Sequence, residues 1–131
     1  MPTNKALLSH RGLFDAVETY FNALYYCDLE LFDQVFHPAS SLFDADQDDV
    51  TVDPIRDYRN VISQRVSPAS KGQEREDEII MIDWLSSDCA TVKVRLRIHD
   101  NIFVDHLCFV RGQGSWRVVA KLWHLEEVMP S

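Results

Sequence analysis

The stretch NIFVDHLCFVRGQGSWRVVAKLWHLE, residues Asn101 to Glu126, contains the clearest structural pattern of the sequence. Two strand-like segments, Ile102–Arg111 and Trp116–Leu125, flank the turn residues Gly112-Gln113-Gly114-Ser115. Alternating apolar positions on both sides of a glycine-rich turn predict a β-hairpin. Because successive side chains of a strand point to opposite faces, each segment presents one mostly apolar row.

Each apolar row of this hairpin contains one charged residue. In the first row it is Asp105, among phenylalanine and leucine side chains, and in the second it is Lys121, beside Trp123. If residues whose numbers sum to 226 face each other, Asp105 lies opposite Lys121, Phe103 opposite Trp123 and Leu107 opposite Val119. The row then forms either a pocket with a few placed polar groups or a buried ion pair in a packed sheet.

Length and charge limit what this hairpin can belong to. A chain of 131 residues suits one compact domain, spanning 1–131. The formal net charge of −8 argues against a nucleic-acid partner, because phosphate binding needs a basic surface. There is no apolar run of about 18 residues for a membrane span and no secretory signal, so we expect a cytoplasmic protein.

The cysteines predict no special chemistry. They are few, widely spaced and without a Cys-x-x-Cys pair, which predicts neither a disulfide framework nor a zinc site. We expect them to be small core residues: Cys27, Cys89 and Cys108.

Hydrophobic periodicity and turn residues predict helices followed by strands. The expected helices lie between Asn4 and Cys27, from Asp28 to His37 and over Pro54–Arg65, and the expected strands are Ala39–Asp44, Asp49–Val52, Glu78–Leu85, Cys89–His99 and the two segments of the hairpin. Tyr20 is placed at the rim of the buried stripe of the first helix. The order is that of an α+β fold, in which a strongly twisted antiparallel or mixed sheet curls around the N-terminal helices into a half-open cone.

Several short motifs, in this order, resemble the nuclear transport factor 2-like superfamily. They are Tyr20-Phe21-Asn22-Ala23-Leu24, Asp28-Leu29-Glu30, Phe36-His37-Pro38-Ala39, Phe103-Val104-Asp105-His106-Leu107 and Gly114-Ser115-Trp116-Arg117-Val118-Val119-Ala120-Lys121. Within it, the chain looks most like the lumazine-binding-like group, close to polyketide-cyclase-type proteins. The resemblance implies a cone-shaped, cystatin-like α+β fold, often a homodimer through the sheet. Such folds host isomerases, dehydratases, hydrolases and plain ligand carriers, so fold alone does not give function.

Ketosteroid isomerases belong to the same superfamily and suggest one possible chemistry. The resemblance brings Tyr20, Asp44 and Asp105 onto their catalytic positions. Asp44 would be the base that removes a proton beside a carbonyl, while Tyr20 and a protonated Asp105 would donate hydrogen bonds to the developing enolate. A cation at Lys121 favours the charged carboxylate and opposes this role.

Two functions remain open. The first is binding of a small, largely apolar or aromatic ligand in the cone by a homodimer, and the alternative is a proton-transfer enzyme, namely an isomerase, dehydratase or cyclase. The residues expected to contact the ligand are Phe21, His37, Tyr58, Phe103, Lys121 and Trp123. His37 is also a candidate cap for the end of the second helix.

We expect no metal or other cofactor, because no local His and carboxylate spacing and no phosphate loop is present. The acidic turn after Asp44 lacks the glycine and the glutamate of a calcium loop. The dimer is expected from apolar residues on the exposed face of the sheet, which include Val94, Leu96 and Val110.

Overall fold

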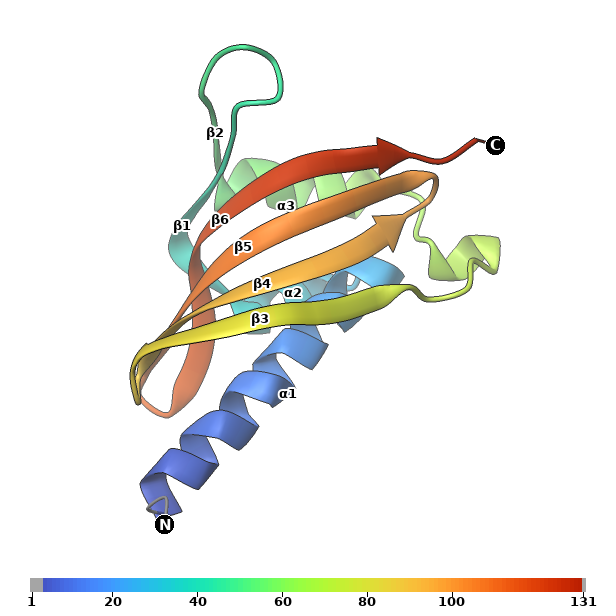
Figure 1. Cartoon of the computed structure of the whole chain (residues 1–131). Helices are drawn as coiled ribbons and strands as arrows, with labels where there is room; N and C mark the ends of the chain where they lie inside the picture. The colour runs from blue at the N-terminus through green and yellow to red at the C-terminus, as the bar shows by residue number, and fades with distance from the viewer. Residues whose placement is uncertain (1–3, 131) are drawn as a thin grey trace.

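Helices cover one face of a curved, six-stranded sheet in the computed structural model, which describes residues 4–130, with side chains from residue 9 onward (Figure 1). The helices are α1 (Asn4–Tyr26), α2 (Leu29–Val35) and α3 (Ile55–Gln64), with a short 3-10 turn at Ala69–Lys71. The strands are β1 (Phe36–Asp44), β2 (Thr51–Pro54), β3 (Asp77–Ser86), β4 (Cys89–Ile98), β5 (Asn101–Gly112) and β6 (Ser115–Val128). The expected α+β class and curved sheet are confirmed.

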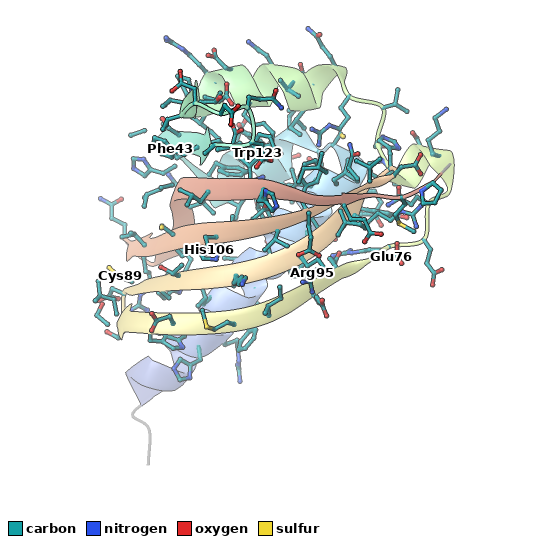
Figure 2. The ribbon with its side chains drawn as sticks, turned by 45° about the horizontal axis from the view of Figure 1, so that its top comes forward. Phe43, Glu76, Cys89, Arg95, His106 and Trp123 are labelled. Atoms are coloured by element: carbon teal, nitrogen blue, oxygen red, sulfur yellow. The ribbon has the colours of Figure 1, made fainter. Side chains whose placement is uncertain are left out.

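The sheet is mixed, with strand order β2-β1-β6-β5-β4-β3. Only β1 and β6 pair in parallel; the other neighbours are antiparallel. We call the side against α1 the inner face and the opposite side the outer face. Figure 2 shows His106 and Arg95 on the outer face, away from α1. The parallel pairing places the end of β1 beside the middle of β6, where Leu42 pairs with Lys121 and Phe43 with Leu122.

The sequence explains where the helices begin and end. Asp28 caps α2, because its Oδ1 accepts hydrogen bonds from the backbone N–H groups of Glu30 (2.9 Å) and Leu31 (3.1 Å). The predicted end at His37 was wrong by two residues: Phe36 already has extended backbone and begins β1. Pro38 restricts the residue before it, and the chain has left the helix before reaching that point.

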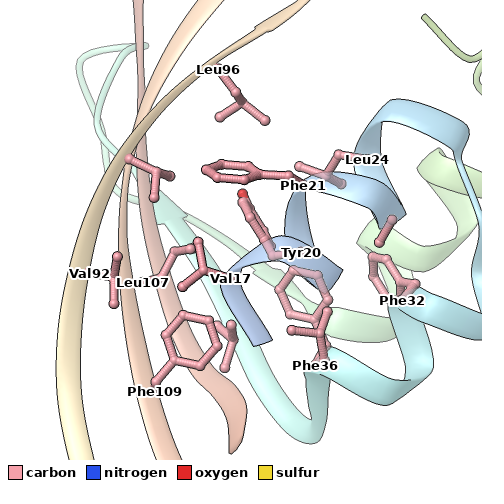
Figure 3. Packing of buried hydrophobic residues seen from close by; sticks show 14 of the residues in the cluster. Val17, Tyr20, Phe21, Leu24, Phe32, Phe36, Val92, Leu96, Leu107 and Phe109 are labelled. Atoms are coloured by element: carbon pink, nitrogen blue, oxygen red, sulfur yellow. The ribbon is translucent and has the colours of Figure 1, made fainter. Parts of the chain in front are cut away.

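The core lies between α1 and the inner face. On β4 every second residue is buried, from Ala90 to Ile98, and on α1 the buried stripe includes Leu13, Val17 and Leu24. Figure 3 shows Tyr20 reaching from α1 into this core, between Phe21 and Phe36. The exposed fraction of Tyr20 is 0%, so its expected place at the rim was wrong.

Two further expectations about burial need correction. Val94 and Leu96 belong to the inner face and are buried, so they cannot contribute to an exposed apolar surface; Val110 is exposed as expected. The cysteines are free thiols that are only half-buried, rather than core residues: Cys27, Cys89 and Cys108.

The register of the β5–β6 hairpin differs from the expected one by two residues. Asp105 pairs with Trp123, and Leu107 pairs with Lys121. One residue of this difference arises at the turn, where Gly112 pairs with Ser115 and Phe109 with Val118. The second arises from a bulge at Val119, because the next pair is Cys108 with Ala120. Asp105 and Lys121 are therefore diagonal neighbours on the inner face instead of direct partners, which still leaves their side chains within reach of each other.

Candidate functional site

A hollow of about 210 Å³ opens between the inner face of the sheet and α3. Its walls come from α1, β1, α3 and the strands β4 to β6, and most of them are apolar. The lining residues are Leu24, Leu42, Asp53, Tyr58, Val61, Arg65, Leu96, Ile98, Phe103, Asp105, Lys121 and Trp123. Four of the residues expected at a site therefore line one hollow together with Asp105: Tyr58, Phe103, Lys121 and Trp123.

A buried ion pair lies in the wall of this hollow. The exposed fractions are 1% for Asp105 and 4% for Lys121, and Lys121 Nζ is 3.6 Å from Asp105 Oδ2. A charge taken out of water is costly unless it is paired and hydrogen-bonded, so each residue depends on the other. The pair is placed by the local fold, since the bulge brings Lys121 to the inner face beside Asp105.

Tyr20 holds the carboxylate from the side of α1. Its hydroxyl donates a hydrogen bond of 2.5 Å to Asp105 Oδ2. Burial raises the pKa of the Tyr20 hydroxyl well above its ordinary value, and the nearby charge of Asp105 raises it further. Tyr20 is therefore a neutral donor, but its hydrogen is directed at Asp105, and Tyr20 is not among the lining residues.

Aromatic rings surround the ammonium group of Lys121. Its Nζ lies 4.8 Å from the ring centroid of Tyr58 and 5.2 Å from that of Tyr20, within the range of cation–π attraction. Nζ also donates to the Tyr58 hydroxyl oxygen, at 3.3 Å. These contacts fix the cation in the wall of the hollow, where it can face a bound molecule.

Phe103 and Trp123 form an aromatic corner of the hollow. Their ring centroids are 5.8 Å apart and the planes meet at 74°. Both side chains are only partly buried. An edge-to-face pair leaves one ring face free to stack on a flat ligand.

Some expected site residues lie elsewhere. Phe21 packs in the core beside Tyr20 and does not line the hollow. His37 is exposed on β1, where its Nδ1 accepts the backbone N–H of Ala39 (3.0 Å), so it is neither at the mouth of the hollow nor a cap for α2. The early start of β1 explains this, because it carries His37 away from the helix end.

Asp44 lies apart from Tyr20 and Asp105. It lines a second hollow, of about 620 Å³, together with outer-face residues such as His106 and Leu122. Trp123 lines both hollows. Of the three residues that the resemblance to ketosteroid isomerases aligned, Tyr20 and Asp105 are joined by a hydrogen bond, while Asp44 lines a different hollow.

Sequence reasoning missed part of the lining. Four lining residues belong to apolar patterns that are the same whether a side chain faces a core or a cavity: Leu24, Leu42, Leu96 and Ile98. Asp53, on β2, and Arg65, directly after α3, bring charges of both signs to the hollow. No local sequence signal reports that α3 folds over the inner face, so these charges could not be assigned in advance.

Among the side chains that the structure describes, no group of three or more His, Cys, Asp or Glu residues could hold a metal ion. Within residues 4–130, no helix is both long and apolar enough to cross a membrane.

Comparison with known proteins supports the same fold. An NTF2-like protein of unknown function from Shewanella baltica is 22% identical, with a TM-score of 0.80 over 100% of both chains. A ketosteroid isomerase-like protein from Erwinia carotovora atroseptica is 13% identical, with a TM-score of 0.68 over 89% of this chain and 95% of that one. A cystatin-like fold protein from Burkholderia xenovorans is 17% identical, with a TM-score of 0.67 over 92% of each chain.

Among the curated proteins, none has a sequence that matches this chain significantly. A family model described as "Putative lumazine-binding" matches residues 9–124, which is most of the chain. This match includes every residue that lines the hollow between α3 and the sheet. The chain therefore belongs to the "Putative lumazine-binding" family.

Proposed function

We propose that the protein binds a small, flat, largely apolar or aromatic molecule in the hollow between α3 and the sheet. The observation that carries this proposal is the buried Asp105–Lys121 pair in an otherwise mostly apolar wall. Binding sites for small molecules combine apolar walls with a few placed polar groups. A pair needed only for packing has no reason to border an opening.

The size and shape of the hollow support a small, flat ligand. About 210 Å³ is below the roughly 300–1,000 Å³ that is usual for drug-sized ligands. The free faces of Phe103 and Trp123 suit a planar ring system. Lumazine, which the family description names, is itself a flat bicyclic heteroaromatic compound and belongs to this class.

Tryptophan fluorescence tests the proposal. We expect flat bicyclic aromatic molecules to quench the emission saturably, because Trp123 lines the hollow. Trp123→Phe should lose the saturable part of the quenching, whereas Trp84→Phe, a matched change on β3 outside the hollow, should keep it. A panel of such molecules that gives neither quenching nor a thermal shift contradicts the proposal.

The proton-transfer alternative has less support from the geometry. Its base, Asp44, lines the outer hollow, and the hydrogen of Tyr20 is already donated to Asp105. A base must come within hydrogen-bond reach of the proton that it removes. We therefore expect wild type and Asp44→Asn to exchange the acidic protons of small ketones in deuterated water at the same, buffer-level rate. Faster exchange by the wild type than by Asp44→Asn would instead support the proton-transfer enzyme.

We further propose that two copies associate through the outer face. Apolar residues remain exposed there, among them Met81 (51%), Leu122 (57%) and Val110 (37%). The helices lie on the inner face (Figure 1), so they do not cover these side chains. Sedimentation should give a dimer mass for the wild type and a monomer mass for Leu122→Glu, while a wild-type monomer at micromolar concentration would contradict the interface.

A further inference from the structure

Arg65 brings a positive charge to the hollow that no acidic side chain of the described chain offsets. It lines the hollow directly after α3 and is half-buried, yet its guanidinium makes no hydrogen bond or ion pair with any residue that the structure describes. The other charges of the lining differ from it. Asp105 and Lys121 offset each other, and Asp53 lies beyond the opposite end of α3, about 15 Å away for a helix of 10 residues.

Arginines elsewhere in the described chain mostly have acidic partners. Among the residues that the structure describes, five arginines each form an ion pair with an Asp or Glu side chain: Arg59, Arg75, Arg95, Arg97 and Arg111. Acidic side chains are plentiful in a protein with a net charge of −8. Of the arginines that lack such a partner, Arg11 and Arg56 are exposed, and Arg117 borders a separate groove beside Gly114. Arg65 alone of these lines the hollow between α3 and the sheet.

The charge of Arg65 acts inside the fold. Burial and the charge of Asp105 raise the pKa of the Tyr20 hydroxyl, and the positive charge of Arg65 opposes that rise. Burial also raises the pKa of the Cys27 thiol, again against the charge of Arg65. A guanidinium directed into bulk water would act far more weakly on a fully buried hydroxyl. The cation therefore belongs to the interior side of the hollow, where a bound molecule meets it.

A carboxylate suits this cation and this hollow together. The planar guanidinium donates two parallel hydrogen bonds to the two oxygens of a carboxylate. A carboxylate attached to an aromatic ring can lie near the plane of that ring, so the whole molecule stays flat. A tetrahedral phosphate would widen the ligand, which a hollow of about 210 Å³ accommodates less well.

We propose that the hollow selects flat aromatic carboxylic acids, whose carboxylate pairs with the guanidinium of Arg65 while the apolar walls and Trp123 hold the ring system. This inference rests on the proposed ligand-binding function and adds to it the charge of the ligand. Asp53 favours one orientation, because its own carboxylate repels an anion from the opposite end of α3. The ligand then supplies the negative charge that Arg65 lacks.

Two probes of the same shape test the charge of the ligand. 2-Naphthoate and 2-naphthamide share their ring system, but only the first is an anion. We expect calorimetric titration of the wild type to show 2-naphthoate binding about tenfold more tightly, the scale of one hydrogen-bonded charge pair. Arg65→Met should abolish this preference by weakening 2-naphthoate alone. Arg56→Met removes the same charge from the exposed side of α3, outside the hollow, and should keep the preference.

The other outcomes overturn defined parts of this account. If 2-naphthamide binds the wild type as tightly as 2-naphthoate, or if Arg65→Met keeps the preference, the aromatic-acid proposal is wrong and the ligand-binding function stands. If Arg56→Met loses the preference as fully as Arg65→Met, the anion responds to net charge and the assignment to Arg65 is wrong. If neither probe binds the wild type, both the aromatic-acid proposal and the ligand-binding function are wrong.

Discussion

Lys121, Asp105 and Tyr20 form a chain of interactions that connects the hollow to α1. The cation faces the cavity, the carboxylate lies behind it, and the Tyr20 hydroxyl donates to that carboxylate from the helix. All three side chains are buried. In such an arrangement each partner is stable only while the others are present, which makes single substitutions informative.

Lys121→Met should lower the free energy of unfolding by about 3 kcal/mol, because it leaves the carboxylate of Asp105 buried without its cation. The double variant Lys121→Met/Asp105→Asn should recover part of the loss, since the carboxylate is then neutralised as well. Urea denaturation measures both values. Lys93→Met on the outer face is the matched control, with an expected change within about 0.5 kcal/mol. If the double variant loses as much free energy of unfolding as Lys121→Met and Asp105→Asn lose when added together, the two residues are not coupled.

Tyr20 should make the protein sensitive to alkali. Burial raises the pKa of its hydroxyl in the folded state, so the neutral form is favoured by folding. This contribution is complete below the ordinary tyrosine value of about 10 and is lost as the pH rises from there towards the folded-state pKa. Between pH 9 and 11.5, the wild type should lose more stability in urea than Tyr20→Phe does. Parallel pH profiles for the two proteins would contradict this.

At the level of elements, α1 approaches β6 closely because Gly12 has no side chain. A Cβ at this position would lie 3.0 Å from Trp116 Cδ1, and Trp116 is held by the rings of Trp84 and the guanidinium of Arg111. We expect Gly12→Leu to lower the free energy of unfolding by about 2 kcal/mol, the usual scale of overpacking. Arg11→Leu, on the exposed side of the same helix turn, should change it by less than about 0.5 kcal/mol. Equal effects of the two substitutions would show that the contact is not tight.

The loop between β1 and β2 is attached to β6 by Asp46. Its Oδ2 accepts the backbone N–H of Leu125 (2.9 Å) and its Oδ1 contacts His124 Nδ1 (2.7 Å). The hydrogen bond from the Leu125 N–H, and next the one with His124, lower the pKa of the Asp46 carboxyl. The attachment is therefore complete above the ordinary carboxyl pKa of about 4, and it weakens as the pH falls through the lowered pKa of the folded protein. Hydrogen exchange at Leu125 should therefore be faster in Asp46→Ala than in the wild type at pH 6. Equal protection would contradict the attachment.

Most of the elements could be predicted from the sequence, but the register of the hairpin could not. The alternation on β4 and the turn before Ser115 carry strong local signals, and the Asp28 cap is visible as a residue type. The exact pairing at the turn shifts the register by one residue, and the bulge at Val119, which has no glycine or proline to mark it, shifts it by one more, so Asp105 and Lys121 are not direct partners. The prediction that both belong to one face was still correct.

At the scale of the whole molecule, the hollow depends on tertiary placement that local patterns do not report. α3 and the last turn of α1 close it from one side, and the curved sheet closes it from the other. The sequence indicated the aromatic and charged residues of β5 and β6, because a charge in an apolar row is unusual. It could not indicate that Asp44 lines a different hollow, since that depends on how the β1 end meets the outer face.

We propose that the hollow between α3 and the sheet receives a small, flat molecule against the Asp105–Lys121 pair. The most direct measurement is a nitrogen–proton NMR spectrum of the three tryptophan indoles during titration with 2-naphthoate. We predict that the Trp123 signal shifts saturably, together with the backbone amides of Leu42 and Ile98, while the signals of Trp84 and Trp116 stay in place. Shifts confined to outer-face residues such as His106 and Leu122, or no saturable shift at all, would contradict the account.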